Sequence, residues 1–332
     1  MDRRNPTAPH TFGDPWQPLP DRLYNTLPAT DPDVFDPKTN RYLPGQVDYM
    51  KRASQLAWIN GLAALFHFIV AGIAFLLVFI YKDHMPRAAL YTDFGQYQPF
   101  AKPFIPNADK IASYFLFAVV LPVSAIAGIF HAVLTFTPYV HRWYTTNALL
   151  RGTNVFRWLE YSITGTLVVW TIAHLSGVTN VFLLGLLAVA NIAACLYAFV
   201  HEQHLHMVRD QLARMTAGTD GARLGKLAES KWVPLMASCI PLMAIWAAIL
   251  VYFVYAVKLS TTHVPIFIWV SVIGAAAVSL LVPVWLFVYT LGWPKFTRNK
   301  FYYECVFIAI SAVLKTLFTM AIIAGSVANR NH

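Results

Sequence analysis

The feature that most constrains this chain is a series of seven apolar stretches, each long enough to cross a lipid bilayer as a helix. A bilayer core about 30 Å thick needs roughly 20 apolar residues of α-helix. One such stretch can be a core helix of a soluble protein, but seven in one chain predict an all-α, seven-transmembrane helix bundle. The stretches cover approximately residues 56–81, 111–137, 154–175, 180–203, 232–257, 264–291 and 302–327.

Composition favours a multi-pass membrane protein and argues against other classes. Charged residues make up 12% of the chain and hydrophobic residues 57%, whereas soluble domains carry about 25% charged residues. The net charge of +9 does not indicate nucleic-acid binding, because the basic residues lie in short loops between apolar stretches. Cys195, Cys239 and Cys305 lie in apolar segments without CxxC spacing, which predicts buried thiols and no metal cluster.

The chain divides into a tail and a membrane domain. Residues 1–52 contain nine prolines and a near-balanced charge, so we expect a disordered tail. Residues 53–329 form the predicted membrane domain. Its longest connection, 82–110, is proline- and aromatic-rich, and we expect it to be an extended loop that folds as a small cap or hairpin.

The distribution of Lys and Arg predicts the orientation in the membrane. Most of the 25 basic residues lie in the N-terminal tail and in the connections after the second, fourth and sixth stretches. Cytoplasmic loops are enriched in Lys and Arg. We therefore expect a cytoplasmic N-terminus, an extracellular C-terminus and an extracellular 82–110 loop, in the cell membrane.

Lys315 lies near the middle of the seventh stretch. A charged side chain at such a depth costs roughly 2.5–3.5 kcal/mol on insertion scales and usually marks function. One interpretation is a structural lysine paired with an acid. The other is an amine that forms an imine with an aldehyde cofactor.

Glu160 is the candidate counterion, because a carboxylate nearby stabilises a protonated imine. It lies about two turns inside the third stretch, and helix geometry places it within possible reach of Lys315. Glu160 can instead pair with Arg157, three residues earlier on the same helix side.

Three further polar residues are predicted to join this site. His67 and His131 lie inside the first and second stretches, and together with the charged pair they suggest a pocket able to take up a proton. Ser311 lies one turn before Lys315 and can face the same volume. Taken singly, each histidine is more typical of a hydrogen-bonded core residue.

A second polar patch, 201–206, ends the fourth stretch with three histidines and a glutamate. A solvated helix end is the favoured interpretation, with zinc binding as the alternative. The chain has no nucleotide loop, nucleophile elbow, paired catalytic carboxylates or HExxH motif, so we do not expect an enzyme.

Read together, these residues resemble the heliorhodopsins. Residues 157–162 (RWLEYS) are similar to that family's third-helix counterion motif, and 311–315 (SAVLK) to its seventh-helix retinal-lysine motif. His67 and His131 match its paired histidines, and the inverted orientation is a hallmark of the family. The resemblance covers roughly residues 54–328.

The resemblance implies a cofactor and roles for these residues. Lys315 is expected to carry retinal, all-trans in the dark, as a protonated Schiff base with Glu160 as counterion. Ser311 is expected to tune the imine, and His67 and His131 to belong to the cavity that receives its proton. The family is generally dimeric, so we expect a homodimer.

Two further positions complete the predicted site. Asn191, eleven residues before Glu202 in the fourth stretch, fits the family pattern. Trp246 is expected to line the pocket as a flat apolar side chain, and a position facing lipid or another helix is the equal alternative. The sixth stretch aligns poorly, so its retinal contacts are unassigned.

The predicted function is light-driven signalling, with an unidentified cytoplasmic partner, because no acid pair marks a complete transmembrane proton route. The alternatives are a light-gated proton channel, a light-insensitive transporter that uses Lys315 and Glu160 as an ion pair, and a scaffold acting through residues 1–52.

Overall fold

The structure is a computed structural model. It describes residues 44–81, 87–98, 102–115, 117–214, 221–260, 263–292 and 299–328. The chain divides into two units, Met1–Lys51 and Arg52–His332. Most of the predicted tail, residues 1–43, lies outside the described residues.

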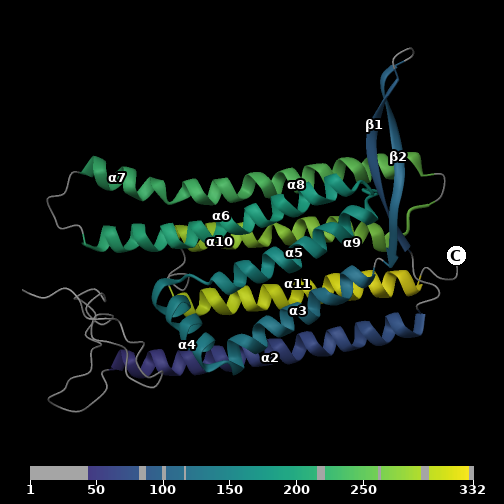
Figure 1. The fold of residues 1–332 in the computed structure, drawn as a ribbon. Helices are drawn as coiled ribbons and strands as arrows, with labels where there is room; N and C mark the ends of the chain where they lie inside the picture. Colours follow the sequence, from purple (N-terminus) through teal and green to yellow (C-terminus); the bar gives the residue numbers. More distant parts are fainter. Residues whose placement is uncertain are drawn as a thin grey trace, which may run out of the picture. The chain divides into compact units, whose positions relative to one another are not determined.

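The second unit is built from helices, most of them long (Figure 1). Its helices are α2 (Pro44–Tyr81, which begins in the first unit), α3 (Phe117–Phe136), α4 (Pro138–Thr146), α5 (Val155–Leu175), α6 (Val181–Arg214), α7 (Gly221–Ser230), α8 (Trp232–Leu259), α9 (Ile266–Ser279), α10 (Leu281–Leu291) and α11 (Lys300–Ala328). A π-helical turn, η2 (Asn147–Arg151), follows α4.

Within the described residues, six segments are long and apolar enough to cross a membrane: Tyr49–Tyr81, Val119–Phe136, Val181–Arg209, Gly225–Leu259, Ile266–Leu291 and Lys300–Ile323. Their outward faces carry many exposed large apolar side chains, such as Leu186, Ile240 and Val270. Lipid solvates such surfaces, whereas water does not. The protein is therefore an integral multi-pass membrane protein with a helical bundle.

Helix α5 corresponds to the third predicted stretch, but it is not among these six segments. Its first two turns contain Arg157, Glu160 and Tyr161, which lower its hydropathy. The helix nevertheless packs against α3, α6, α8 and α9. It lies inside the bundle, so its polar side chains face other helices.

Several predicted boundaries were wrong. The stretch predicted over 111–137 begins as a strand, and its helix starts only at Phe117. The stretch 264–291 matches one membrane-spanning segment, Ile266–Leu291, but its helix is interrupted at Leu280, because Pro283 has no N–H to donate to the carbonyl of Ser279. Helix α6 continues to Arg214, well past the predicted end at 203, and α2 starts at Pro44, inside the predicted tail.

The long connection between α2 and α3 contains an antiparallel hairpin, β1 (Arg87–Gln98) and β2 (Lys102–Phe115). It lies at the end of the bundle where α5 ends and α6 begins (Figure 1). There the Tyr91 N–H donates to the Thr179 carbonyl at 3.0 Å. Gly177 makes this α5–α6 turn possible, because its φ of 88° disfavours a side chain.

The bundle has two chemically different halves. The apolar half, on the hairpin side, contains a continuous core that includes Val120, Val169, Ile172, Ile322 and Ile323. The polar half contains the first two turns of α5 and the first half of α11. There two smaller apolar clusters, one around Trp158 and Phe307 and one around Leu56 and Tyr144, flank a group of buried polar side chains.

Candidate functional site

The amine of Lys315 lies against a carboxylate in the middle of the bundle. Lys315 Nζ donates to Glu160 Oε1 at 2.5 Å and to Ser311 Oγ at 2.5 Å. Lys315 and Glu160 are 7% and 4% exposed, so the pair is shielded from solvent and lipid. Thr164 Oγ1 lies 3.0 Å from the same Glu160 oxygen, and the amine also lies 4.7 Å from the centroid of the Tyr161 ring. The structure therefore brings the three predicted residues together.

A cavity of about 390 Å³ adjoins this pair. Lys315 and Ser311 lie in its wall, and the lining is otherwise mostly apolar side chains of α5, α6, α8, α9, α10 and α11. Small-molecule sites typically measure 300–1,000 Å³ and combine apolar walls with a few polar groups. The size and lining fit a mostly apolar small molecule that lies beside the amine.

The remaining cavity residues include two that the sequence predicted. Trp246 lines the cavity and is buried against Ile245 and Ile249 of the apolar core. Asn191 also lines it, but its Nδ2 donates to Thr166 Oγ1 at 3.2 Å, which ties α6 to α5. The sixth stretch, which the sequence left unassigned, contributes nine lining residues: Val270, Ser271, Gly274, Ala275, Val278, Ser279, Val282, Pro283 and Leu286.

Arg157 does not pair with Glu160, which corrects that alternative. Arg157 Nη1 donates to Glu304 Oε1 at 2.8 Å, and Arg157 Nη2 forms an ion pair with Glu202 Oε1. The guanidinium carbon also lies 3.9 Å from the centroid of the Phe307 ring. One cation on α5 thus joins two carboxylates, on α6 and α11, in the polar half.

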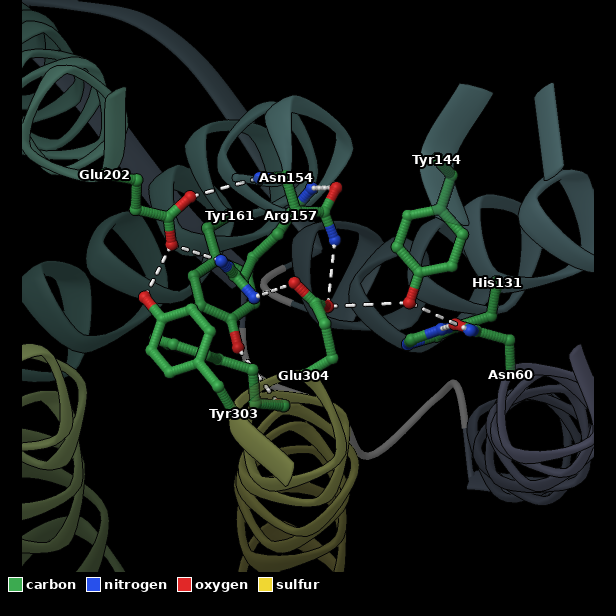
Figure 2. Close-up of polar contacts among 10 residues, drawn as sticks. Asn60, His131, Tyr144, Asn154, Arg157, Tyr161, Glu202, Tyr303 and Glu304 are labelled. Carbon is green, nitrogen blue, oxygen red and sulfur yellow. Dashed lines mark hydrogen bonds and ion pairs between the residues drawn. The ribbon is translucent and has the colours of Figure 1, made fainter. Parts of the chain in front are cut away.

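Neighbouring groups also donate hydrogen bonds to both carboxylates (Figure 2). The Tyr303 hydroxyl donates to Glu202 Oε1 at 2.6 Å, and the backbone N–H of Asn154 donates to Glu202 Oε2 at 3.1 Å. The Asn154 side-chain amide donates to Glu304 Oε2 at 3.1 Å. Asn154 also caps α5 by accepting from the Arg157 N–H, so the start of this helix is fixed by the same network.

The network continues from Glu304 toward the histidines. The Tyr144 hydroxyl donates to Glu304 Oε2 at 3.4 Å and lies 3.2 Å from Asn60 Nδ2, which donates to it. Burial, and then the Glu304 carboxylate, raise the pKa of Tyr144 well above its usual range, so its hydroxyl remains a proton donor. Asn60 Oδ1 lies 2.7 Å from His131 Nδ1.

This arrangement determines the tautomer of neutral His131. Asn60 Nδ2 donates to the Leu56 carbonyl at 2.8 Å, which leaves Oδ1 as an acceptor facing His131. His131 Nδ1 therefore carries a hydrogen, and Nε2 is the nitrogen that can gain a proton. The His67 ring stacks on His131, with centroids 5.6 Å apart and planes 8° apart.

The histidines do not line the larger cavity. His131 lines a separate cavity of about 30 Å³, together with Asn60, Glu304, Glu160 and Ser311. His67 is fully buried, and neither of its ring nitrogens has a hydrogen-bond partner within the described residues. The predicted proton-accepting side of the site thus lies next to the Lys315–Glu160 pair, away from the apolar cavity.

The 201–206 patch is neither a solvated helix end nor a zinc site. His201 is fully buried and its Nε2 lies 2.8 Å from Thr290 Oγ1, while Glu202 faces Arg157. His204 Nε2 contacts Ser230 Oγ at 3.1 Å. No group of three potential metal ligands occurs in the part of the chain that the structure describes.

Sequence reasoning missed Glu304, Asn60 and Tyr144 as members of the site. A signal for Glu304 was present, because positions 304, 311 and 315 recur at helical spacing on one face of α11. Asn60 likewise lies seven residues before His67 on α2. Tyr144 lies in α4, outside the predicted stretches, and gave no such signal.

Comparison with protein families identifies a match over most of the chain. The family model described as Heliorhodopsin matches residues 56–327, which covers α3 to α10 and most of α2 and α11. The chain matches no curated protein.

Proposed function

The chain belongs to the heliorhodopsin family, and we propose that it senses light through retinal attached to Lys315. One observation carries the proposal: a buried amine at the wall of an apolar cavity of about 390 Å³ lies 2.5 Å from a buried carboxylate. An apolar polyene with an aldehyde end suits that cavity, with the flat side chain of Trp246 along its wall.

Retinal, all-trans in the dark and joined to Lys315 as a protonated Schiff base, supplies light absorption and isomerisation. Glu160 stabilises the positive charge at Nζ as the counterion, and the Ser311 hydroxyl accepts a hydrogen bond from it. Displacement of Nζ from Glu160 weakens this stabilisation. The Nζ proton then passes to the polar half, where His131 Nε2 is an available acceptor.

Seven spans and a cytoplasmic N-terminus form part of the proposal. Helix α5 is the seventh span, because it packs against four other helices and its charged residues face inward. The Lys and Arg residues of the tail and of the connections on its side support a position of the polar half toward the cytoplasm. An epitope at the N-terminus should be protected from protease in intact cells and cleaved in inverted vesicles.

Signalling is the output that the charge distribution favours. All buried Asp, Glu, Lys and Arg side chains of the described residues lie at Lys315 or in the polar half. Within the described residues, the apolar half thus contains no buried carboxylate, Lys or Arg that continues a charged route toward the opposite side. By family membership we further propose a homodimer and a cytoplasmic signalling partner; chemical crosslinking in native membranes tests the dimer.

The deciding experiment is purification after addition of all-trans-retinal. Wild-type protein should show a visible absorption band that hydroxylamine bleaches, and Lys315→Ala should remain colourless. Lys258→Ala, an exposed lysine at the end of α8, is the matched control and should keep the band. A colourless wild-type protein would reject the proposal in favour of a light-insensitive transporter.

The light-gated proton channel is the second candidate, because Glu202 and Glu304 add carboxylates beside the site. Voltage-clamp recording separates it from signalling. We expect no sustained photocurrent. A sustained current that disappears in Glu160→Gln or Glu202→Gln, but not in the exposed-carboxylate control Glu229→Gln, would favour the channel.

A further inference from the structure

The buried charges of the described residues do not balance. The buried cations are Arg157 and Lys315, and the buried carboxylates are Glu160, Glu202 and Glu304. The Lys315–Glu160 pair is neutral as a unit. Two carboxylates therefore depend on the single guanidinium of Arg157.

The geometry shows that both carboxylates share this one cation. Glu304 contacts Nη1 and Glu202 contacts Nη2 of the same guanidinium, so the two acids lie on either side of one planar group. Glu202 is 1% exposed and Glu304 0%. Water therefore cannot screen a second negative charge at this position.

A buried charge without a partner is strongly unfavourable, and two carboxylates that share one site do not both ionise readily. We propose that Glu202 and Glu304 share one proton in the resting protein, so that Arg157 stabilises a single negative charge. The resident proton belongs to the pair and not to one of its members.

The surrounding donors make the two acids comparable hosts for this proton. Glu202 receives Arg157, the Tyr303 hydroxyl and the Asn154 backbone N–H. Glu304 receives Arg157, the Asn154 side-chain amide and the Tyr144 hydroxyl. Each carboxylate thus has three donors, and all of them except Arg157 are neutral groups that leave the charge uncompensated.

The histidines are poorer hosts for the balancing proton. A protonated His67 would need acceptors for two N–H groups, and within the described residues it has none. His131 Nδ1 already donates to Asn60, and both rings are buried, so a positive charge on either ring is disfavoured by the loss of hydration.

The shared proton gives the polar half a second protonation site. Glu304 and Glu160 line the same cavity of about 30 Å³, so the pair lies next to the group whose charge the proposed photoreaction changes. A proton that changes hosts between Glu202 and Glu304 shifts the ionic partner of Arg157 between α6 and α11. The pair can therefore convert a change of charge into a change of helix contacts.

Infrared spectroscopy of the full-length protein, purified without retinal in an ester-free detergent, tests this inference. A protonated carboxylic acid has a C=O stretch that an ionised carboxylate lacks. Wild-type protein labelled with ¹³C-glutamate should show an isotope-shifted C=O band at neutral pH. Absence of a labelled band in wild type would overturn the proposal, and this arm requires no variant.

Single variants test whether the proton is shared. In Glu202→Gln or Glu304→Gln, one carboxylate faces one guanidinium, so the remaining acid should ionise and the C=O band should vanish in both. Glu229→Gln is the control and should keep the band. A band that survives in either buried variant, verified as folded by gel filtration and circular dichroism, would overturn the sharing.

The outcome is separable from the retinal proposal, because these spectra are recorded without retinal. A labelled band in a protein that never becomes coloured would support the shared proton and reject the photoreceptor. A coloured protein without the band would support the photoreceptor and overturn the shared proton.

Discussion

The two halves of the bundle differ in how they are held together, although the same helices run through both. In the apolar half, α5 and α11 contribute Val169, Ile172, Ile322 and Ile323 to one continuous core. In the polar half, the same helices contribute Arg157 and Glu304 to a network of ions and hydrogen bonds. Apolar packing therefore stabilises the apolar half, and charge pairing stabilises the polar half.

Lys315 lies at the boundary between these environments. Its amine contacts Glu160 and Ser311 on one side and borders the apolar cavity on the other. In the proposed reaction, the apolar ligand therefore lies on one side of Nζ, and the proposed proton acceptor, His131, lies on the other.

Replacing Arg157 should cause the largest loss of stability. Arg157→Met leaves Glu202 and Glu304 buried without a cation, which we expect to cost about 3–5 kcal/mol of unfolding free energy. The triple variant Arg157→Met, Glu202→Gln, Glu304→Gln should recover most of it, because a neutral cluster needs no partner. Unfolding in mixed micelles measures the loss of stability in the single and the triple variant. Equal losses in the two proteins would refute the claim that charge pairing stabilises the polar half.

In the apolar half, Ile322→Ala should cost less than the loss of Arg157. This side chain is fully buried, and its truncation leaves a cavity expected to cost about 2–3 kcal/mol. The absorption band should not move. Val313→Ala on the same helix is 53% exposed and serves as control, with a change below about 0.5 kcal/mol. Similar losses at both positions would show that packing does not hold this half.

A smaller loss is expected for Gly152→Ala at the end of the polar half. Gly152 has φ of 73°, and a Cβ there would lie 2.5 Å from the Tyr289 hydroxyl oxygen. We expect a cost of about 1–2 kcal/mol from strain and displacement of Tyr289. Gly185→Ala, in open space on α6, should instead be neutral or stabilising. Thermal unfolding compares the two, and an unchanged Gly152→Ala protein would contradict the prediction.

The smallest predicted change is for Tyr144→Phe. Loss of its hydroxyl removes one donor from Glu304 and one acceptor from Asn60, at a cost of about 1 kcal/mol. Because the link from His131 to the acid pair is cut, the glutamate C=O band should also shift. Tyr139→Phe, 74% exposed at the start of α4, should change neither the stability nor the band. An unshifted band in Tyr144→Phe would show that the two ends of the network are independent.

The sequence predicted that Lys315, Ser311 and Glu160 lie together, but it did not predict the charge cluster around Arg157. Lys315, Ser311 and Glu160 were predictable because a charge inside an apolar stretch is conspicuous and helical spacing defines its face. The partner of Arg157 was not predictable. Glu160 is close to it along the helix, but Lys315 of α11 attracts Glu160, and Arg157 turns to acids on α6 and α11.

The amino-acid sequence by itself determined that the chain forms membrane-embedded helices with a charged residue in the last of them. Hydropathy and helical periodicity are local properties, which each segment carries wherever it packs. Only the tertiary structure decided which carboxylate meets which cation and how α4 brings Tyr144 to Glu304. These contacts join residues 45 to 160 positions apart in the sequence, and packing of the helices brings their side chains within bonding distance.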